Sequence, residues 1–292
     1  MIVTRIHGGL GNQMFQYALG RRLSLATGLP LRFETGSRNP SPLGRFYLDR
    51  FPIAGQRAPA IESALRWRAR ARLLEAPLHA AGLSRRLIRL HRVYVQRSLD
   101  FDPAVLQIRH PVYLVGHWQS ERYFSDIAAT IRADFTPLGG PKTASAALLA
   151  DIARAESVCV HVRRGDYASN PHLAAAQGVC GMDYYDAARR YIETRVHSPH
   201  FFVFSDDIPW CRNAFQAWCN TTFVAHNRVD EPHEDLRLMV QCRHFITGNS
   251  TFSWWAAWLG SHSSKHVITP LRWCIAQPEN ADALIPRHWV RI

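Results

Sequence analysis

Residues 158–167 read VCVHVRRGDY, an alternating run rich in valine that ends in two arginines, a glycine and an acid. Such a run is typical of a buried strand in an α/β sheet, where ligands bind at the carboxyl ends of strands. Guanidinium groups bind oxyanions in a bidentate way, so Arg163 and Arg164 predict a phosphate or carboxylate site. Gly165 allows a sharp backbone turn. Taken alone, the motif fits a solvated turn equally well.

Strands and helices alternate on the carboxyl side of this run. The regular rhythm predicts right-handed βαβ crossovers and a parallel sheet. We expect strands at 158–162, 201–204, 222–225, 244–247 and 266–268, with helices at 142–155, 183–196, 210–218, 234–242 and 252–259.

The amino-terminal part predicts a second α/β lobe. A short strand at 2–6 is followed by the glycine-rich turn HGGLGNQ at 7–13 and a helix at 14–27. This order is typical of the first βα unit of a nucleotide-binding type of domain. Residues 136–141, TPLGGP, are the best linker candidate because they hold several breakers in a row. We therefore expect two Rossmann-like lobes, 1–140 and 141–292, with a cleft between them.

Three further turns of the second lobe carry polar side chains. Ser205-Asp206-Asp207 follow a strand, and Asp235 lies in the first turn of a predicted helix. The third turn, 248–253, opens a helix with hydroxyl groups, and helix starts of this kind bind phosphate. Capping of the helices explains each turn on its own. Together with Arg163, they favour a diphosphate site, with Asp235 available to accept the N–H donors of a guanine.

A metal site is the less favoured interpretation. Asp100 and Asp102 have the D-x-D spacing of manganese-dependent glycosyltransferases, but a turn before Pro103 also explains them. The fifteen histidines show no H-E-x-x-H spacing. Two arginines aimed at a diphosphate would supply the charge of a metal, so we expect no metal requirement.

Composition places the chain among globular proteins. Of its 292 residues 47% are hydrophobic and 20% charged, and no apolar run reaches the ~20 residues of a membrane helix. The start of the chain lacks the pattern of a signal peptide. The six cysteines show no C-x-x-C pair and are expected to be reduced thiols of a cytoplasmic protein.

The net charge of +12 comes almost entirely from arginine. Residues 61–97 hold nine of the arginines, and leucines at helical spacing predict basic helices inserted in the first lobe. The arginine face of these helices fits two interpretations, a solvated surface or a surface that docks on anionic lipid. A protein that binds RNA or another polyanion is the alternative class, but it leaves the phosphate-type turns unexplained.

Four motifs in order resemble the family 11 glycosyltransferases, the α-1,2-fucosyltransferases that in bacteria mostly build surface polysaccharide such as O-antigen. The motifs are HGGLGNQMFQYA at 7–18, HVRRGDY at 161–167, FVFSDD at 202–207 and NSTFSWWAAWL at 249–259. The resemblance implies an inverting, metal-independent enzyme of GT-B type that uses GDP-β-L-fucose. It also implies that the second lobe binds the donor and the first lobe the acceptor.

The resemblance further implies a set of site residues. Arg163 would hold the β-phosphate with support from Arg164, and Asp235 would accept from guanine. The expected donor-binding residues are Asn12, His161, Arg163, Arg164, Asp206, Asp235, Asn249, Ser250, Thr251 and Phe252. The acceptor would be a galactose-terminated, lipid-linked oligosaccharide at the inner face of the plasma membrane, with no nucleic acid partner.

In the implied reaction, a galactose 2-hydroxyl attacks C1 of fucose and GDP leaves. Charge stabilisation by arginine is expected to be the main contribution of the protein. Asp166 and His7 are the candidates for a general base, and the sequence does not choose between them.

Overall fold

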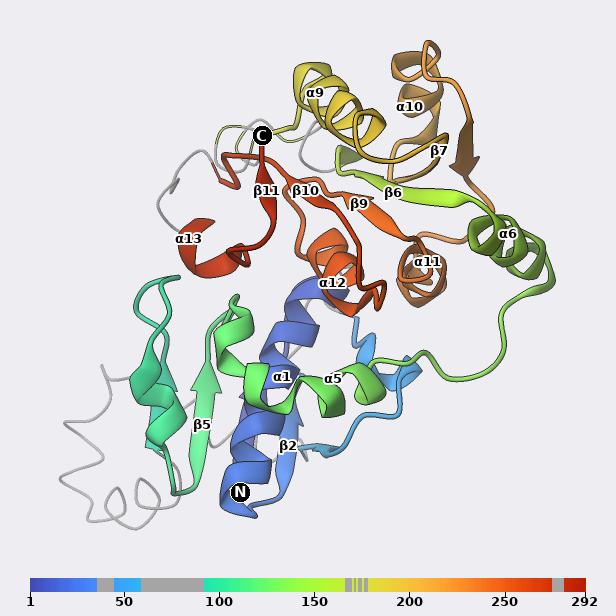
Figure 1. Cartoon of the computed structure of the whole chain (residues 1–292). Coiled ribbons are helices and arrows are strands. Elements are labelled where there is room, and N and C mark those ends of the chain that lie inside the picture. Colours follow the sequence, from blue (N-terminus) through green and yellow to red (C-terminus); the bar gives the residue numbers. More distant parts are fainter. Residues whose placement is uncertain are drawn as a thin grey trace, which may run out of the picture. The chain divides into compact units, whose positions relative to one another are not determined.

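The computed structural model describes residues 1–35, 45–58, 92–165, 170, 172, 175, 178–274 and 281–292. These residues divide into two units, Met1–Phe135 and Thr136–Ile292, each with its own sheet (Figure 1). Every strand pairing in both sheets is parallel. The predicted fold class, mixed α/β with two Rossmann-like lobes, is confirmed. The predicted boundary lay at 140/141, within the breaker-rich segment that opens the second unit.

The second unit has a six-stranded sheet in the order β11-β10-β9-β6-β7-β8. Its strands are β6 Glu156–Val162, β7 Pro199–Ser205, β8 Thr221–Val224, β9 His244–Ile246, β10 Val267–Thr269 and β11 Val290–Arg291. Its helices are α6 Thr143–Arg154, α9 Met182–Glu193, α10 Ile208–Ala214, α11 Pro232–Met239, α12 Thr251–Leu259 and α13 Ala281–Leu284.

The order of these strands reverses between β6 and β9. From β6 the chain builds outward through β7 to β8, then returns to β9 on the other side of β6 and continues to β10 and β11. Val160 of β6 pairs with Ile246 of β9 at this point. A reversal of this kind opens a crevice at the carboxyl ends of the two strands, which is where doubly wound sheets bind ligands.

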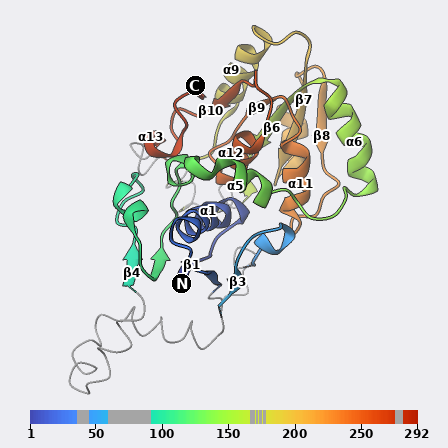
Figure 2. The same cartoon turned by 60° about the horizontal axis from the view of Figure 1, so that its bottom comes forward.

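Helices cover both faces of this sheet. One face packs Val158, Val160 and Val162 against α9 and α10, through side chains such as Tyr185 and Cys211. The other face is covered by α12, with α6 beside α11 (Figures 1 and 2). Because both faces are buried, β6 is rich in valine from residue 158 to residue 162.

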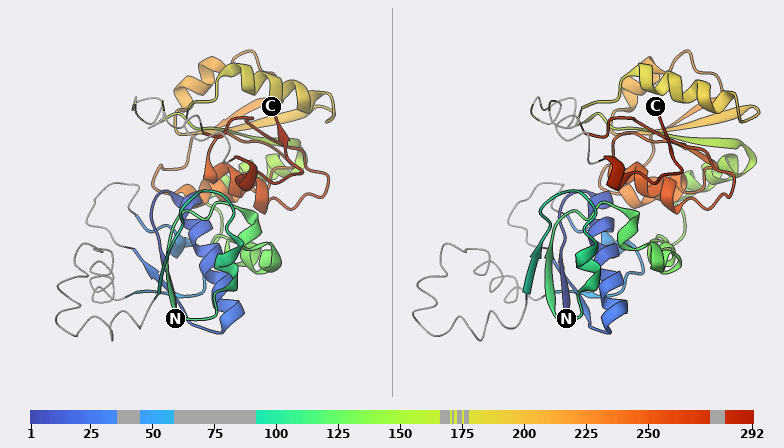
Figure 3. Two further views of the ribbon diagram at one scale, coloured as in Figure 1. Left: turned by 90° about the vertical axis from the view of Figure 1, so that its left-hand side faces the viewer. Right: turned by 60° about the vertical axis from the view of Figure 1, so that its left-hand side comes forward.

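The first unit has a five-stranded sheet in the order β3-β2-β1-β5-β4. Helix α1 lies along one face of it (Figure 3), where buried Tyr17 packs against Phe33 and Phe135. Its elements are β1 Ile2–Arg5, α1 Leu10–Thr27, β2 Leu31–Glu34, η2 Leu48–Arg50, β3 Gln56–Arg57, β4 Arg92–Val95, η4 Pro103–Gln107, β5 Val112–Val115, η5 Glu121–Tyr123, η6 Ser125–Ile127 and α5 Ala128–Asp134. Strand β5 pairs with the other side of β1, so the carboxyl ends of β1 and β5 are adjacent.

Residues 92–95 correct one prediction. The basic segment was expected to be helical to residue 97, but Arg92–Val95 form strand β4, which pairs with β5 in parallel. Val93, Tyr94 and Val95 favour a strand, and β5 offers a free edge for pairing. The rest of the predicted basic helices, 61–91, lies outside the described residues.

Among the described helices α1 is the longest, with 18 residues. None of these helices has the length and hydropathy of a membrane span.

Candidate functional site

Asp206 organises the turn that follows β6. One of its oxygens, Oδ1, accepts from the backbone N–H of Arg164 at 2.8 Å and of Gly165 at 3.1 Å. The other, Oδ2, lies 2.7 Å from Nη1 of Arg163. A single carboxylate from the end of β7 therefore fixes both the backbone and the first guanidinium of the arginine turn.

Arg164 is held by different groups. Its Nε lies 3.5 Å from Oδ2 of Asp207, and its guanidinium stacks 3.9 Å from the ring centre of Trp210. Asp207 also accepts from the N–H of Trp210 at 3.2 Å, which caps α10. The capping interpretation of this acid is correct, and the acid contacts an arginine as well.

Gly165 meets a steric requirement. A Cβ at this position would lie 2.6 Å from Oδ2 of Asp206, a distance that real Cβ atoms do not adopt. Only glycine lets the turn approach Asp206 closely enough for the two backbone hydrogen bonds.

The turn after β9 lies against the end of β6. A Cβ at Gly248 would lie 3.1 Å from the carbonyl oxygen of His161. Asn249 is buried and donates to the carbonyl of Gly178 at 3.1 Å, while Ser250 caps α12 by accepting from Phe252 N–H at 3.3 Å. The amino end of a nine-residue helix thus starts beside the arginine turn.

His161 lies under this junction. Its ring is buried and contacts Phe252 edge to face at 5.7 Å. Burial lowers the pKa of His161 to about 4, against an opposing effect of Asp206. The ring is therefore neutral at pH 7 and adds no charge to the site.

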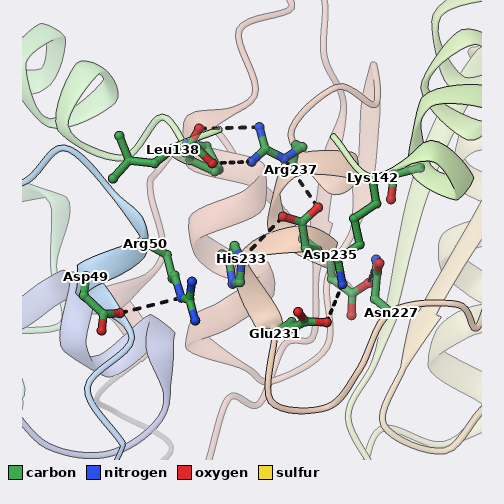
Figure 4. Close-up of polar contacts among 12 residues, drawn as sticks. Asp49, Arg50, Leu138, Lys142, Asn227, Glu231, His233, Asp235 and Arg237 are labelled. Atoms are coloured by element: carbon green, nitrogen blue, oxygen red, sulfur yellow. Dashed lines mark hydrogen bonds and ion pairs between the residues drawn. The ribbon is translucent and has the colours of Figure 1, made fainter. Parts of the chain in front are cut away.

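Asp235 lies in the first turn of α11, and its Oδ1 accepts from Nδ2 of Asn227 at 2.7 Å (Figure 4). Burial raises the pKa of the Asp235 carboxyl, and the Asn227 hydrogen bond opposes that shift. Oδ1 of Asn227 is itself buried without a hydrogen-bond partner among the described residues. Asn227 therefore holds one oxygen of the Asp235 carboxylate in place.

Neighbouring ion pairs hold α11 in position. Glu234 is buried and lies 3.6 Å from Nε of Arg237, whose Nη2 donates to the carbonyl of Leu138 at 2.9 Å (Figure 4). Lys142 pairs with Glu231. The segment 137–142 that begins the second unit is thereby fixed to the helix that presents Asp235.

The predicted residues separate into two groups. The predicted residues of the second unit lie at the carboxyl ends of β6, β7 and β9 or at the starts of α11 and α12. They are His161, Arg163, Arg164, Asp206, Asp235, Asn249, Ser250, Thr251 and Phe252. His7 and Asn12 lie in the first unit, after β1. Asp166 lies outside the described residues. The chemical role of each of these residues stays a prediction.

Sequence reasoning did not select Asn227, Trp210 or the pairing of Asp207 with Arg164. Asn227 could have been found, because it follows β8 by three residues and so lies at the same carboxyl edge. The contact between Trp210 and Arg164 depends on packing across two loops and leaves no pattern in the sequence.

In the first unit, His7 and Asn12 meet the end of β5. The His7 and His117 rings pack edge to face with centres 5.0 Å apart. Oδ1 of Asn12 accepts from Nε2 of Gln119 at 3.0 Å. These residues share the carboxyl edge formed by β1 and β5.

The D-x-D pair has local roles. Asp102 accepts from the Tyr94 hydroxyl at 2.6 Å and from Ala104 N–H at 3.0 Å, and Asp100 accepts from Ser98 at 2.7 Å. This is the turn before Pro103 that the sequence suggested. Within the described residues, no three His, Cys, Asp or Glu side chains form a group that could hold a metal.

Known proteins are similar to this chain over its whole length. The family model described as glycosyl transferase family 11 matches residues 91–292. An alpha-1,2-colitosyltransferase of Escherichia coli is 32% identical over 315 residues, covering 100% of this chain and 99% of that protein. The E. coli O-antigen biosynthesis glycosyltransferase WbnK is 31% identical over 306 residues, with coverages of 98% and 99%. A galactoside alpha-(1,2)-fucosyltransferase 1 of Leontocebus fuscicollis is 28% identical over 274 residues, with coverages of 89% and 66%.

Proposed function

The chain belongs to glycosyltransferase family 11, and we propose that it transfers L-fucose from GDP-β-L-fucose to the 2-hydroxyl of a terminal galactose. The acceptor is a surface glycan such as a lipid-linked O-antigen unit. A relative named for O-antigen biosynthesis and a second named as an α-1,2-fucosyltransferase support the glycan class and the linkage. The basic composition suits contact with an anionic membrane surface.

The observation that carries this proposal is the pair of turns at the switch point of the second sheet. Arg163 and Arg164 end β6, and the capped start of α12 follows β9 directly beside it. Arginine forks and a helix amino terminus both favour negative charge, so a diphosphate fits between them. The two arginines carry the charge that a metal supplies in other transferases, so we propose a metal-independent reaction.

The proposed step forms a bond between the acceptor oxygen and C1 of fucose with inversion, and it breaks the bond from C1 to the β-phosphate oxygen. The electron pair leaves with GDP. Arg163 stabilises the developing charge, because Asp206 already holds its guanidinium in a fixed orientation. Asp206 is thus a positioning residue in this proposal.

Asp235 and Asn227 form the proposed guanine subsite. Guanine presents two adjacent N–H donors, and the Asp235 carboxylate, oriented by the hydrogen bond from Asn227, offers two acceptor oxygens. Adenine presents a ring-nitrogen acceptor at the corresponding position, so the subsite disfavours it. This chemistry supports GDP as the leaving group.

A second donor, GDP-colitose, is favoured by the relative that is 32% identical and named as a colitosyltransferase. Colitose is fucose without its 3-hydroxyl, so the two donors share the nucleotide and the linkage chemistry. A transfer assay that offers both donors with a panel of β-galactosides tests the proposal. Product linkage is read by NMR. An α-1,2 product supports the proposal, and a product of another linkage, or none with either donor, contradicts it.

A further inference from the structure

The carboxyl edge of the first sheet carries a second cluster of polar side chains. The strands β1 and β5 pair in parallel and end side by side. His7 follows β1 and His117 follows β5, and their rings are in edge-to-face contact at 5.0 Å. Asn12 and Gln119 are hydrogen-bonded at 3.0 Å on the same two segments. The cluster therefore lies at the carboxyl edge of a parallel sheet, the edge at which open α/β sheets bind ligands.

The backbone that carries His117 is held in an unusual conformation. Trp118 has φ of 57°, although it is bulky and fully buried. A side chain of that kind is strained in the left-handed region and persists there only where its surroundings impose it. Strain of this type concentrates at functional sites.

Gln96 imposes this conformation. Its Oε1 accepts from the backbone N–H of both His117, at 2.8 Å, and Trp118, at 3.0 Å. Gly116, the residue before His117, has no room for a side chain, because a Cβ there would lie 2.6 Å from Cβ of Gln96. The end of β4 thus fixes the position of His117.

The two ring nitrogens of His117 differ. Nδ1 is buried without a hydrogen-bond partner among the described residues, whereas Nε2 is not one of the buried atoms. Burial lowers the pKa of His117, so its ring is neutral at pH 7. A neutral imidazole with one accessible nitrogen and a fixed backbone meets the requirements of a general base.

We propose that this edge of the first sheet binds the acceptor sugar, and that Nε2 of His117 takes the proton from the attacking hydroxyl. The inference rests on the proposed transferase function. As the oxygen bonds to C1 of the donor sugar, its proton moves to Nε2, and the bond to the diphosphate breaks with the electron pair leaving on GDP. The imidazolium then releases its proton to water. His7, packed edge-on, orients the ring, and Asn12 and Gln119 are neutral hydrogen-bonding groups for the sugar.

The test is His117→Gln in the full chain, with His110→Gln as a matched control. His110 precedes β5 by two residues and His117 follows it by two, so the control lies at the opposite end of the same strand. His117→Gln is expected to lower kcat/KM for the acceptor by about 100- to 10,000-fold, the range of general base catalysis. GDP affinity, measured by calorimetry, is expected to stay within about twofold, and His110→Gln to leave both quantities unchanged.

The pH profile of the unmodified protein gives a second test that does not depend on how a variant folds. The titratable group in ring contact with His117 is His7. The profile of kcat/KM should fall on the acid side with a midpoint below 6.5, the ordinary value for histidine. A profile without that fall, or a His117→Gln variant within about tenfold of the unmodified protein, overturns the proposal. Failure of the proposed function itself is read separately, as absence of transfer by the unmodified protein with either GDP-sugar.

Discussion

At the scale of single residues, Asp206 is the centre of the candidate donor site. Its two oxygens hold one guanidinium and two backbone N–H groups. An arginine fixed in this way needs little reorganisation when a diphosphate arrives, and preorganised donors are the most effective kind in catalysis. The sequence interpretation named Asp206 only as a donor-binding residue and did not predict which group would orient Arg163. The structure gives that contact to Asp206.

Gly165→Ala tests how closely this turn must pack. The new Cβ would meet Oδ2 of Asp206 at 2.6 Å, so the Asp206 contacts have to shift. We expect GDP affinity to fall by about 5- to 150-fold, the size of an overpacking cost of 1–3 kcal/mol. Gly140→Ala is the control, because a Cβ at Gly140 meets nothing within 4 Å. Equal GDP affinity in the two variants, measured by calorimetry, would show that GDP binding does not depend on the close approach of Gly165 to Asp206.

Asp235→Asn tests the guanine subsite. The substitution presents an amide donor where an acceptor is needed, so GDP binding should weaken by about tenfold or more and the preference for GDP over ADP should shrink. Asp183→Asn is the matched control, since Asp183 is an exposed acid in the first turn of α9. An unchanged GDP-to-ADP affinity ratio in Asp235→Asn would show that the base is recognised elsewhere.

At the scale of elements, strand β6 joins the core to the site. Val158, Val160 and Val162 face α9 and α10. His161 faces α12 and lies two residues before Arg163. A buried neutral histidine makes the strand sensitive to acid, because the unfolded chain takes up a proton near pH 6.5 while folded His161 does so only at about 4.

The second unit should therefore lose stability as pH falls from 6.5 to 4, and the contribution of His161 is fully present only above 6.5. The expected slope is about 1.4 kcal/mol per pH unit for one proton. His161→Asn should reduce the slope by that amount, whereas His262→Asn, at an exposed position, should not. Denaturant unfolding at several pH values supplies the measurement. A slope that is identical in the two variants would contradict the assignment.

Most elements of the second unit were predictable, because buried parallel strands are apolar runs and the helices between them are periodic. The prediction for β6 ends at Val162, where the strand ends. Strand β4 was not predicted, because Tyr94 also continued a helical spacing of leucines and only its pairing with β5 decides the structure. Helix α5 begins only at Ala128, because the two 3-10 turns η5 and η6 precede it.

The candidate site was predictable where it follows strand ends and not where it depends on packing. Arg163 and Asp206 both follow strands, so their proximity was expected from a parallel sheet. The role of His117 leaves no signal in the sequence. It depends on the left-handed conformation of Trp118 and on two hydrogen bonds to Gln96, and both are tertiary contacts.

At the scale of the whole molecule, the chain carries two parallel sheets, and predicted site residues follow the carboxyl ends of strands in both. Predicted donor residues of the second unit lie at the switch point of its sheet, and His7 and Asn12 follow β1 at the carboxyl edge of the first sheet. Since a transferase needs one site for its donor and another for its acceptor, two such edges on one chain suit the proposed division of labour.

The central claim is that Arg163 holds the diphosphate of a GDP-sugar. Calorimetric titration of GDP into the unmodified chain, Arg163→Ala and Arg154→Ala tests it most directly. Arg154 is an exposed arginine at the end of α6, so its loss matches the change in charge. We predict that Arg163→Ala weakens GDP binding by about 10- to 100-fold, the worth of a charge-assisted hydrogen bond, while Arg154→Ala leaves it unchanged. Equal affinity for GDP in the folded Arg163→Ala variant and the unmodified chain would contradict the claim.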